Sequence, residues 1–422
     1  MGTGLLRLGA VTCGALALCV GAASAGPGLI IGTGDDGLKW TEATGNVVKA
    51  HQEVGLNAVR VTLHWRQGLT RADDDGRTHL RRAQNAARLG HRVVLGIFGD
   101  PSGPPVTAEQ REQYCQFVRD ALSRARAVQD VTIWNEANSA VFWKPQKGAA
   151  ALYAALLAHC YDTLHSYRRT VNVISTTAPR ENPAKFIAEL GAAYRAMGRD
   201  KPIFDTFGHN VYPEYSSESP LVVHPGLPVL DQGDYVRLIA TLTTAFRDTA
   251  QPVPGSGSIT IPATGTGFRA RPAIERPVTI WYLETGFETV VPAEKRGHYT
   301  GKEPNRRLVQ PLAPKTRSAL VVPDQVSQLR DALELAYCQP AVGAFFNFMF
   351  VDEAGLGGWQ SGLLWADGTP KPSYDGFKTA VAAVLAGTVD CNRFPVAVTG
   401  PRPATTTTTT TSTTATTTTA KP

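Results

Sequence analysis

Two glutamates follow apolar segments of this 422-residue sequence in similar surroundings. Glu136 lies in Ile133–Asn138 (Ile-Trp-Asn-Glu-Ala-Asn), and Glu284 lies in Ile280–Gly286 (Ile-Trp-Tyr-Leu-Glu-Thr-Gly). If both carboxyl groups face one cleft, one can protonate a leaving oxygen while the other attacks or directs water, as cleavage of a glycosidic bond requires. Two nearby carboxyl groups do not both ionise easily, so one of them can act as an acid near neutral pH. The alternative is that one glutamate only forms an ion pair with an arginine inside the fold.

Both glutamates end predicted strands in a repeating pattern of strand and helix. Eight β-branched, apolar runs predict strands: Leu29–Gly32, Ala58–Leu63, Arg92–Phe98, Val131–Trp134, Val171–Ser175, Phe204–Gly208, Val278–Leu283 and Ala344–Phe350. Seven amphipathic segments predict helices: Ala83–Leu89, Ala108–Ala127, Ala149–Tyr167, Pro183–Met197, Tyr235–Arg247, Asp324–Tyr337 and Tyr374–Leu385. Apolar strands that alternate with helices predict a parallel sheet covered by helices, and eight such units predict a closed (β/α)8 TIM barrel, an α/β fold. Active sites form at the carboxyl ends of the strands of such a barrel, so Glu136 and Glu284 would share one mouth.

An open, doubly wound sheet is the alternative architecture. It requires a glycine-rich phosphate-binding turn after the first strand. Residues 32–37 read Gly-Thr-Gly-Asp-Asp-Gly, in which two aspartates would repel a pyrophosphate. The sequence therefore favours the barrel.

Two connections are longer than ordinary loops. The segment Gln251–Pro277 is rich in Gly, Pro, Ser and Thr and is predicted to be a loop excursion. The segment Thr285–Pro323 follows the seventh strand, on the catalytic side, and carries seven basic residues: Lys295, Arg296, Lys302, Arg306, Arg307, Lys315 and Arg317. It is either a solvated surface loop or a cleft wall that contacts an anionic or long substrate, which makes an acidic glycan the partner to test.

The amino-terminal residues 1–25 have the pattern of a secretory signal peptide. Arg7 supplies positive charge, Leu8–Ala23 is mostly apolar or small, and Ala23-Ser24-Ala25 forms an A-x-A cleavage site. The alternative, a membrane anchor, needs about 20 apolar residues, and this run is shorter and interrupted by glycine. We expect a secreted, extracellular chain without a membrane span after cleavage, either soluble or associated with the cell wall.

The other end, residues 396–422, is a predicted disordered tail. Thirteen of the 15 residues in Thr405–Thr419 are threonine, so this segment cannot bury a core. It is either an O-glycosylated stalk or a solvated tail with no specific role. Residues 26–395 are then one catalytic domain.

Composition excludes several classes of protein. A chain with 43% hydrophobic and 18% charged residues is not fully disordered. The net charge of +6 is diffuse, and no nucleic-acid-binding motif occurs, so we expect no nucleic acid partner. No His-x-His pair stands at a strand end and no cysteines have CxxC spacing, so we expect no metal and no cofactor, which argues against a metal-dependent hydrolase or a lyase.

The segment Trp134–Asn138 resembles the strand-four signature of glycoside hydrolase clan A, in which Asn-Glu marks the acid/base. Leu283–Gly286 resembles the strand-seven nucleophile region of that clan, 148 residues after Glu136 (284 − 136). The resemblance covers Leu29 to Phe377 and looks most like the cellulase-like families 39 and 5. It implies retaining hydrolysis of β-type glycosides, with Glu136 as general acid and then general base and Glu284 as nucleophile. Asn135 would then bind the sugar 2-hydroxyl.

Residues of the second strand and residues that follow the sixth strand fit the same site. Arg60 lies within the second strand, where a buried guanidinium needs a carboxylate, and the clan places an arginine there beside the nucleophile. The clan often has His-x-Tyr after strand six, with the tyrosine bonded to the nucleophile. Here Tyr212 matches, but the histidine is His209, three residues earlier, and Asn210 occupies the usual slot. His209 is therefore either a sugar ligand or a packed core residue.

Tryptophans offer faces on which sugar rings stack. We select Trp359, in the loop after the eighth strand, with Trp65 at the end of the second strand in reserve. Many clan members have a tryptophan at the very end of strand eight, and here that position is Phe350 or Met349. Each tryptophan could instead belong to the core.

Four cysteines remain after removal of the signal, and they allow three pairings. In a barrel, Cys115 and Cys160 lie on neighbouring helices, and Cys338 and Cys391 lie together at the opposite face from the site. We therefore expect the bridges Cys115–Cys160 and Cys338–Cys391, in keeping with export. The sequence favours a secreted retaining glycosidase acting on a poly- or oligosaccharide. A non-catalytic, cell-surface glycan-binding barrel is the alternative, and it would keep Trp359 and lose a carboxylate.

Overall fold

The computed structural model describes residues 28–265, 271–304, 307–312 and 323–394. The predicted signal (1–25) and tail (396–422) lie outside these residues. So do Arg306, Lys315 and Arg317 of the basic loop.

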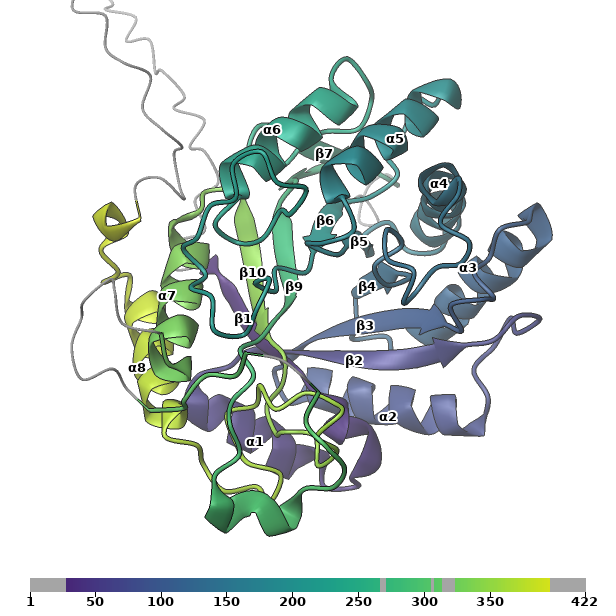
Figure 1. Ribbon diagram of the computed structural model, residues 1–422. Coiled ribbons are helices and arrows are strands. Elements are labelled where there is room, and N and C mark those ends of the chain that lie inside the picture. Colours follow the sequence, from purple (N-terminus) through teal and green to yellow (C-terminus); the bar gives the residue numbers. More distant parts are fainter. Residues whose placement is uncertain (1–27, 266–270, 305–306, 313–322, 395–422) are drawn as a thin grey trace, which may run out of the picture.

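Within the described residues, eight parallel strands close into a barrel, which confirms the predicted fold (Figure 1). The strands are β1 (Ile30–Gly34), β2 (Ala58–Trp65), β3 (Arg92–Gly99), β4 (Asp130–Ile133), β5 (Asn172–Thr177), β6 (Thr206–His209), β9 (Ile280–Thr285) and β10 (Val342–Asn347). Each strand pairs with the next in chain order, and β10 pairs with β1 to close the circle. Closure leaves no exposed edge in the barrel, and it brings the carboxyl ends of all eight strands to one rim.

Helices cover the outside of the barrel (Figure 1). They are α1 (Thr44–Val54), α2 (Asp74–Arg88), α3 (Ala108–Arg124), α4 (Ala149–Tyr167), α5 (Pro183–Ala196), α6 (Tyr235–Phe246), α7 (Gln325–Cys338) and α8 (Ser373–Ala386). Helix α1 was absent from the prediction. Its buried face alternates polar and apolar residues, Thr44, Val48, His51 and Val54, so the apolar pattern alone is weak.

The long connection Gln251–Pro277 differs from the prediction. It contains an antiparallel hairpin of β7 (Ser258–Ile261) and β8 (Ile274–Pro277), with Ser258 opposite Pro277. In β7 the side chains of Ile259 and Ile261 are buried and those between them are exposed, which is the period-two pattern of a half-buried strand. Neighbouring Gly, Pro and Ser residues hide this short alternation in the sequence.

Two disulfides connect the outer layer, and both were predicted. Cys115 of α3 is bonded to Cys160 of α4, and Cys338 at the end of α7 is bonded to Cys391 in the short 3-10 helix η5 (Cys391–Arg393). Across the described ranges, the helices are all too short or too polar to cross a membrane.

Candidate active site

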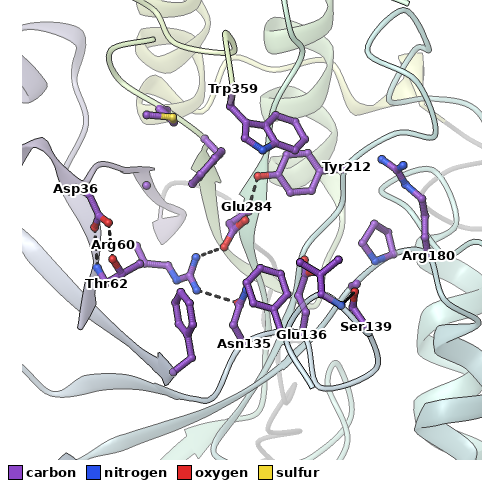
Figure 2. A pocket seen from close by; sticks show the side chains of 18 of the residues that line it. Asp36, Arg60, Thr62, Asn135, Glu136, Ser139, Arg180, Tyr212, Glu284 and Trp359 are labelled. Atoms are coloured by element: carbon purple, nitrogen blue, oxygen red, sulfur yellow. Dashed lines mark hydrogen bonds and ion pairs between the residues drawn. The ribbon is translucent and has the colours of Figure 1, made fainter. Parts of the chain in front are cut away.

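A cavity of about 490 Å³ lies at the carboxyl ends of the barrel strands (Figure 2). Its walls come from the segments that follow β1, β4, β5, β6 and β10 and from side chains within β2, β3 and β9. Glu136 and Glu284 both line it. A volume of this size is typical of small-molecule sites.

Glu284, on β9, is fixed from two sides (Figure 2). The guanidinium of Arg60 donates from Nη1 to Oε1 of Glu284, and the Tyr212 hydroxyl donates to Oε2 at 3.0 Å. Arg60 is 3% exposed and also donates from Nη2 to Oδ1 of Asn135 at 3.1 Å. An ion pair with Arg60 and a hydrogen bond from the uncharged Tyr212 hydroxyl therefore orient this carboxylate, and Arg60 links it to the strand-four segment.

The backbone after β4 turns sharply to present Glu136. Trp134 has φ of 65° and Glu136 has φ of 39°, both in the left-handed region that side chains rarely adopt. Packing holds this turn, because the fully buried Trp134 donates from its ring nitrogen to the Phe142 carbonyl at 2.8 Å. The Glu136 backbone N–H donates to the Thr176 hydroxyl at 2.9 Å. The turn aims the Glu136 side chain into the cavity.

Glu136 differs from Glu284 in its electrostatic surroundings. Burial, and then the negative charge of Glu284, raise the pKa of Glu136 to about 7. Asn210 opposes this by donating from Nδ2 to Oε1 of Glu136 at 2.6 Å, which favours the charged form. Since Arg60 is bonded to Glu284 and Asn135, Glu136 has no guanidinium of its own among the contacts in the described chain. Glu136 thus carries an exchangeable proton near neutral pH.

Aromatic rings form one wall of the cavity. Trp359, after β10, lies with its ring centroid 4.7 Å from that of Tyr212 and 5.9 Å from that of Phe348. The Trp359 backbone N–H donates to the Glu353 carboxylate at 2.7 Å, which ties its loop down. Ring faces beside carboxylates suit the alternating CH and OH faces of a sugar.

Six of the eight residues selected from the sequence line this cavity: Arg60, Asn135, Glu136, Tyr212, Glu284 and Trp359. The other two, His209 and Trp65, do not line it, so the structure does not support their selection as sugar ligands.

His209 is fully buried behind the cavity rather than in it. Its ring contacts the Thr177 hydroxyl at 2.7 Å and the Leu230 carbonyl at 2.7 Å, and burial lowers its pKa to about 4. A neutral, doubly bonded imidazole has no ring nitrogen left for a sugar. Its role is to connect β6 to the following loop.

Trp65 belongs to the core. It is 1% exposed, packs edge-on against Tyr114 and Trp134 at centroid distances of 5.3 and 6.1 Å, and donates to the Leu69 carbonyl at 2.9 Å. It supports the turn that presents Glu136. Its position at a strand end was not enough to place it in the cavity.

Sequence reasoning missed two contributors. Asn210 bonds Glu136, and its place two residues before Tyr212, where the clan has histidine, was the available signal. Phe348 lines the cavity together with Met349, because β10 ends at Asn347 and does not reach Phe350 as predicted. Phe350 instead turns into the core against His51, with ring centroids 4.5 Å apart.

One group of side chains away from this cavity has the spacing of metal ligands. Ligand atoms of Glu218, His224 and Asp231 lie within 4.8 Å of one another. The two ring nitrogens of His224 contact Asp234 at 3.0 Å and Glu218 at 3.2 Å. The carboxylate of Asp231, followed by those of Asp234 and Glu218, raises the pKa of His224 to about 10. An imidazolium has no lone pair for a metal, so this group is best described as an ion cluster that fixes the loop after β6.

Comparisons with known proteins find similarity in fold and not in sequence. No protein-family model and no curated protein sequence matches the chain. The GH53 catalytic domain of Ignisphaera aggregans superposes with a TM-score of 0.53 and 15% identity, covering 84% of this chain and 96% of that one. A GH2 beta-galacturonidase from Eisenbergiella tayi (TM-score 0.46, 12% identity, 81% of this chain and 47% of that one) and a beta-glucuronidase from Parabacteroides merdae (0.45, 13%, 83% and 36%) also match. The chain therefore shares the barrel fold of a glycoside hydrolase, while the resemblance to families 39 and 5 stays a prediction.

Proposed function

We propose that this protein is a retaining glycoside hydrolase that cleaves O-glycosidic bonds of a poly- or oligosaccharide by double displacement. The observation that carries the proposal is the unequal pair of carboxyl groups in one cavity. Glu284 is oriented by Arg60 and Tyr212, whereas the pKa of Glu136 is raised to about 7. One group is set as a nucleophile and the other as an acid.

In the first step, Glu136 donates its proton to the glycosidic oxygen while an oxygen of Glu284 attacks the anomeric carbon. The carbon–oxygen bond to the leaving group breaks and a glycosyl ester of Glu284 forms. Asn135, whose side-chain oxygen accepts from Arg60 at 3.1 Å, would bind the hydroxyl next to the reacting carbon. A contact that strengthens as positive charge develops on the sugar lowers the barrier.

The second step uses the same groups in reverse. The ester removes the negative charge of Glu284, which is one of the causes of the raised pKa of Glu136. The pKa of Glu136 therefore falls in the intermediate, and the carboxylate accepts a proton from water as the water oxygen attacks the anomeric carbon. The ester bond breaks, Glu284 regains its charge, and Glu136 is protonated again.

We further propose that the enzyme acts outside the cell. The signal-like residues 1–25 predict export, and the two disulfides are compatible with an oxidising compartment. Residues 26–395 would be the whole catalytic unit, with the cleft supplying the contacts to the carbohydrate.

The test is a screen of the purified protein on aryl β-glycosides and polysaccharides, followed by NMR of the first anomer released. We expect hydrolysis with retention of configuration. Prompt appearance of the inverted anomer would contradict the assignment of Glu284 as nucleophile. Binding of glycans without any hydrolysis would instead support the alternative of a glycan-binding barrel.

A further inference from the structure

A second cavity, of about 320 Å³, adjoins the first. The two share Arg180, Tyr212 and Trp359 as lining residues, so they are neighbouring compartments of one cleft. Tyr212 is also bonded to Glu284. A sugar unit in the second cavity would therefore lie beside the unit whose bond is cleaved.

Two arginines, Arg180 and Arg307, line this second cavity. Arg180 donates to the Pro213 carbonyl at 3.0 Å, and the Arg307 guanidinium lies 4.8 Å from the ring centroid of Tyr215. Among the ion pairs of the described residues, neither arginine takes part, whereas Lys295 in the same basic segment as Arg307 bonds Asp367 at 2.7 Å. A guanidinium stacked on a ring keeps its N–H edges available for a planar anion.

Carboxylates are present in the same cavity and have to be counted. Glu288 is 1% exposed and accepts from the Ser216 hydroxyl at 3.4 Å, and its charge acts on the buried ammonium of Lys371, raising the pKa of that group against the larger effect of burial. Its charge is thus partly opposed by Lys371, which is itself paired with Asp352 at 2.7 Å. Glu214 also lines the cavity. Carboxylates of this kind accept hydrogen bonds from sugar hydroxyls.

We propose that the second cavity binds a uronate, a sugar unit that carries a carboxylate, next to the cleavage site. The carboxylate lies between Arg180 and Arg307, and the hydroxyls of the same unit donate to Glu214 and Glu288. A neutral hexose would fill the volume but leave both guanidiniums without an anion. This inference rests on the proposed function and makes an acidic glycan the substrate.

The experiment measures binding to the Glu284→Gln protein, which keeps the second cavity intact and does not consume the ligand. The probes are oligosaccharides from pectin, alginate and glucuronoxylan, each beside its carboxyl-reduced form, in which a CH2OH group replaces the carboxylate and every linkage is kept. We expect at least one acidic probe to bind roughly tenfold or more tightly than its reduced counterpart, because a charge-assisted bidentate contact is lost on reduction.

Substitutions test whether the preference for the acidic probe arises in the second cavity. We expect Arg307→Met to abolish the preference for the acidic probe and to leave binding of the reduced probe unchanged, while Arg307→Lys restores part of the preference. Arg296→Met is the matched control, because Arg296 lies on the exposed 3-10 helix η4 (Ala293–His298), outside both cavities, and the substitution changes the net charge equally.

Three results would overturn the inference: equal affinity for acidic and reduced probes, equal effects of the two methionine variants, or no binding of any acidic probe. The proposed function is judged separately, on the wild-type protein. Hydrolysis of neutral glycans with no preference for acidic ones would leave the hydrolase and remove the uronate site. Arg307-dependent binding of a uronate without hydrolysis of any probe would support the uronate site and contradict the proposed hydrolase.

Discussion

The barrel carries a polar network at each end of its strands, and the two networks differ in how their charges are matched. At the amino ends, Arg92 of β3 donates from two nitrogens to Asp130 of β4, both at 2.8 Å. Asn172 of β5 donates to the same carboxylate at 2.8 Å, and Thr206 of β6 donates to Asn172 at 2.8 Å. One cation meets one anion, and the neutral groups complete the hydrogen bonds.

At the carboxyl ends, guanidiniums and carboxylates are not matched one to one: among the ion pairs of the described residues, Glu284 has a cationic partner and Glu136 has none. Arg60 bonds Glu284, and the pKa of Glu136 rises to about 7 because burial and the charge of Glu284 both disfavour its ionised form. The backbone at Glu136 also has a left-handed φ, which the matched network at the other end does not require. The paired charges of Arg92 and Asp130 hold neighbouring strands together, whereas the unpaired carboxyl group of Glu136 can exchange a proton.

The largest expected effect comes from removing the paired carboxylate. We expect Glu284→Gln to lower kcat by at least about 10⁴-fold while the protein stays folded, because the nucleophile is lost. The substitution also removes the negative charge of Glu284, which is one of the causes of the raised pKa of Glu136, so this pKa should fall below about 7. Kinetics, circular dichroism and NMR titration of the Glu136 carboxyl measure these outcomes, and surviving activity would contradict the assigned nucleophile.

Removing the unpaired carboxyl should have a smaller, substrate-dependent effect. We expect Glu136→Gln to lower kcat on an alkyl glycoside by about 10³-fold, the usual contribution of a general acid. An aryl glycoside with a nitrophenolate leaving group needs little protonation, so its cleavage step should suffer much less. The measurement is burst-phase kinetics on both substrates, and equal losses would argue against Glu136 as the acid.

Breaking the matched network should affect stability and not catalysis. We expect Asp130→Ala to lower the free energy of unfolding by about 2 kcal/mol, because Asn172 and Arg92 lose their acceptor. The Arg92 side chain is 45% exposed and can turn to water, which keeps the cost below that of a fully buried pair. Urea unfolding measures the loss, Asp130→Asn is the milder control, and a fall in kcat at equal folded fraction would show that the two ends are coupled.

The smallest expected effect is a shift in the pH profile. Hydrolysis needs Glu136 protonated, so kcat/KM should fall as the pH rises through about 7. Asn210 donates to the ionised form and lowers this pKa, so Asn210→Ala should raise it and move the alkaline limb to higher pH by up to about one unit. The acid limb is the internal control, and a shift of the alkaline limb to lower pH would contradict the assignment.

The sequence was sufficient to predict those parts of the fold that follow from a local pattern of residues. Apolar runs followed by helical segments predicted the barrel and, with it, the approach of Glu136 and Glu284, because a closed parallel sheet has only one carboxyl rim. The same reasoning missed α1, whose buried face includes His51. It also treated Gln251–Pro277 as a loop, although a hairpin forms there.

Within the site, the sequence predicted which residue types lie near the strand ends, but it did not predict which way their side chains point. Arg60 within β2 and Tyr212 after β6 bond Glu284, whereas Trp65 and His209, the last residues of the same two strands, are buried outside the cavity. Alternate residues of a strand face opposite sides, and a shift of one residue at the strand end reverses the direction. Strand ends are also the least predictable part of a strand, as the end of β10 shows.

The sequence by itself determined the fold, the two carboxyl groups that meet in it and the cysteines that can pair, because strand order and parallel closure follow from patterns along the chain. The resemblance to the clan predicted Arg60 beside Glu284, but only the tertiary structure decided how strongly the surroundings of the two carboxyl groups differ. Glu136 and Glu284 have similar flanking residues. The pKa of Glu136 is raised by burial and by the charge of Glu284, Asn210 in the loop after β6 partly opposes this rise, and Arg60, which is 224 positions away in the sequence, bonds Glu284. Electrostatic free energies depend on distances through space and on exclusion of water, and neither is written in the local sequence.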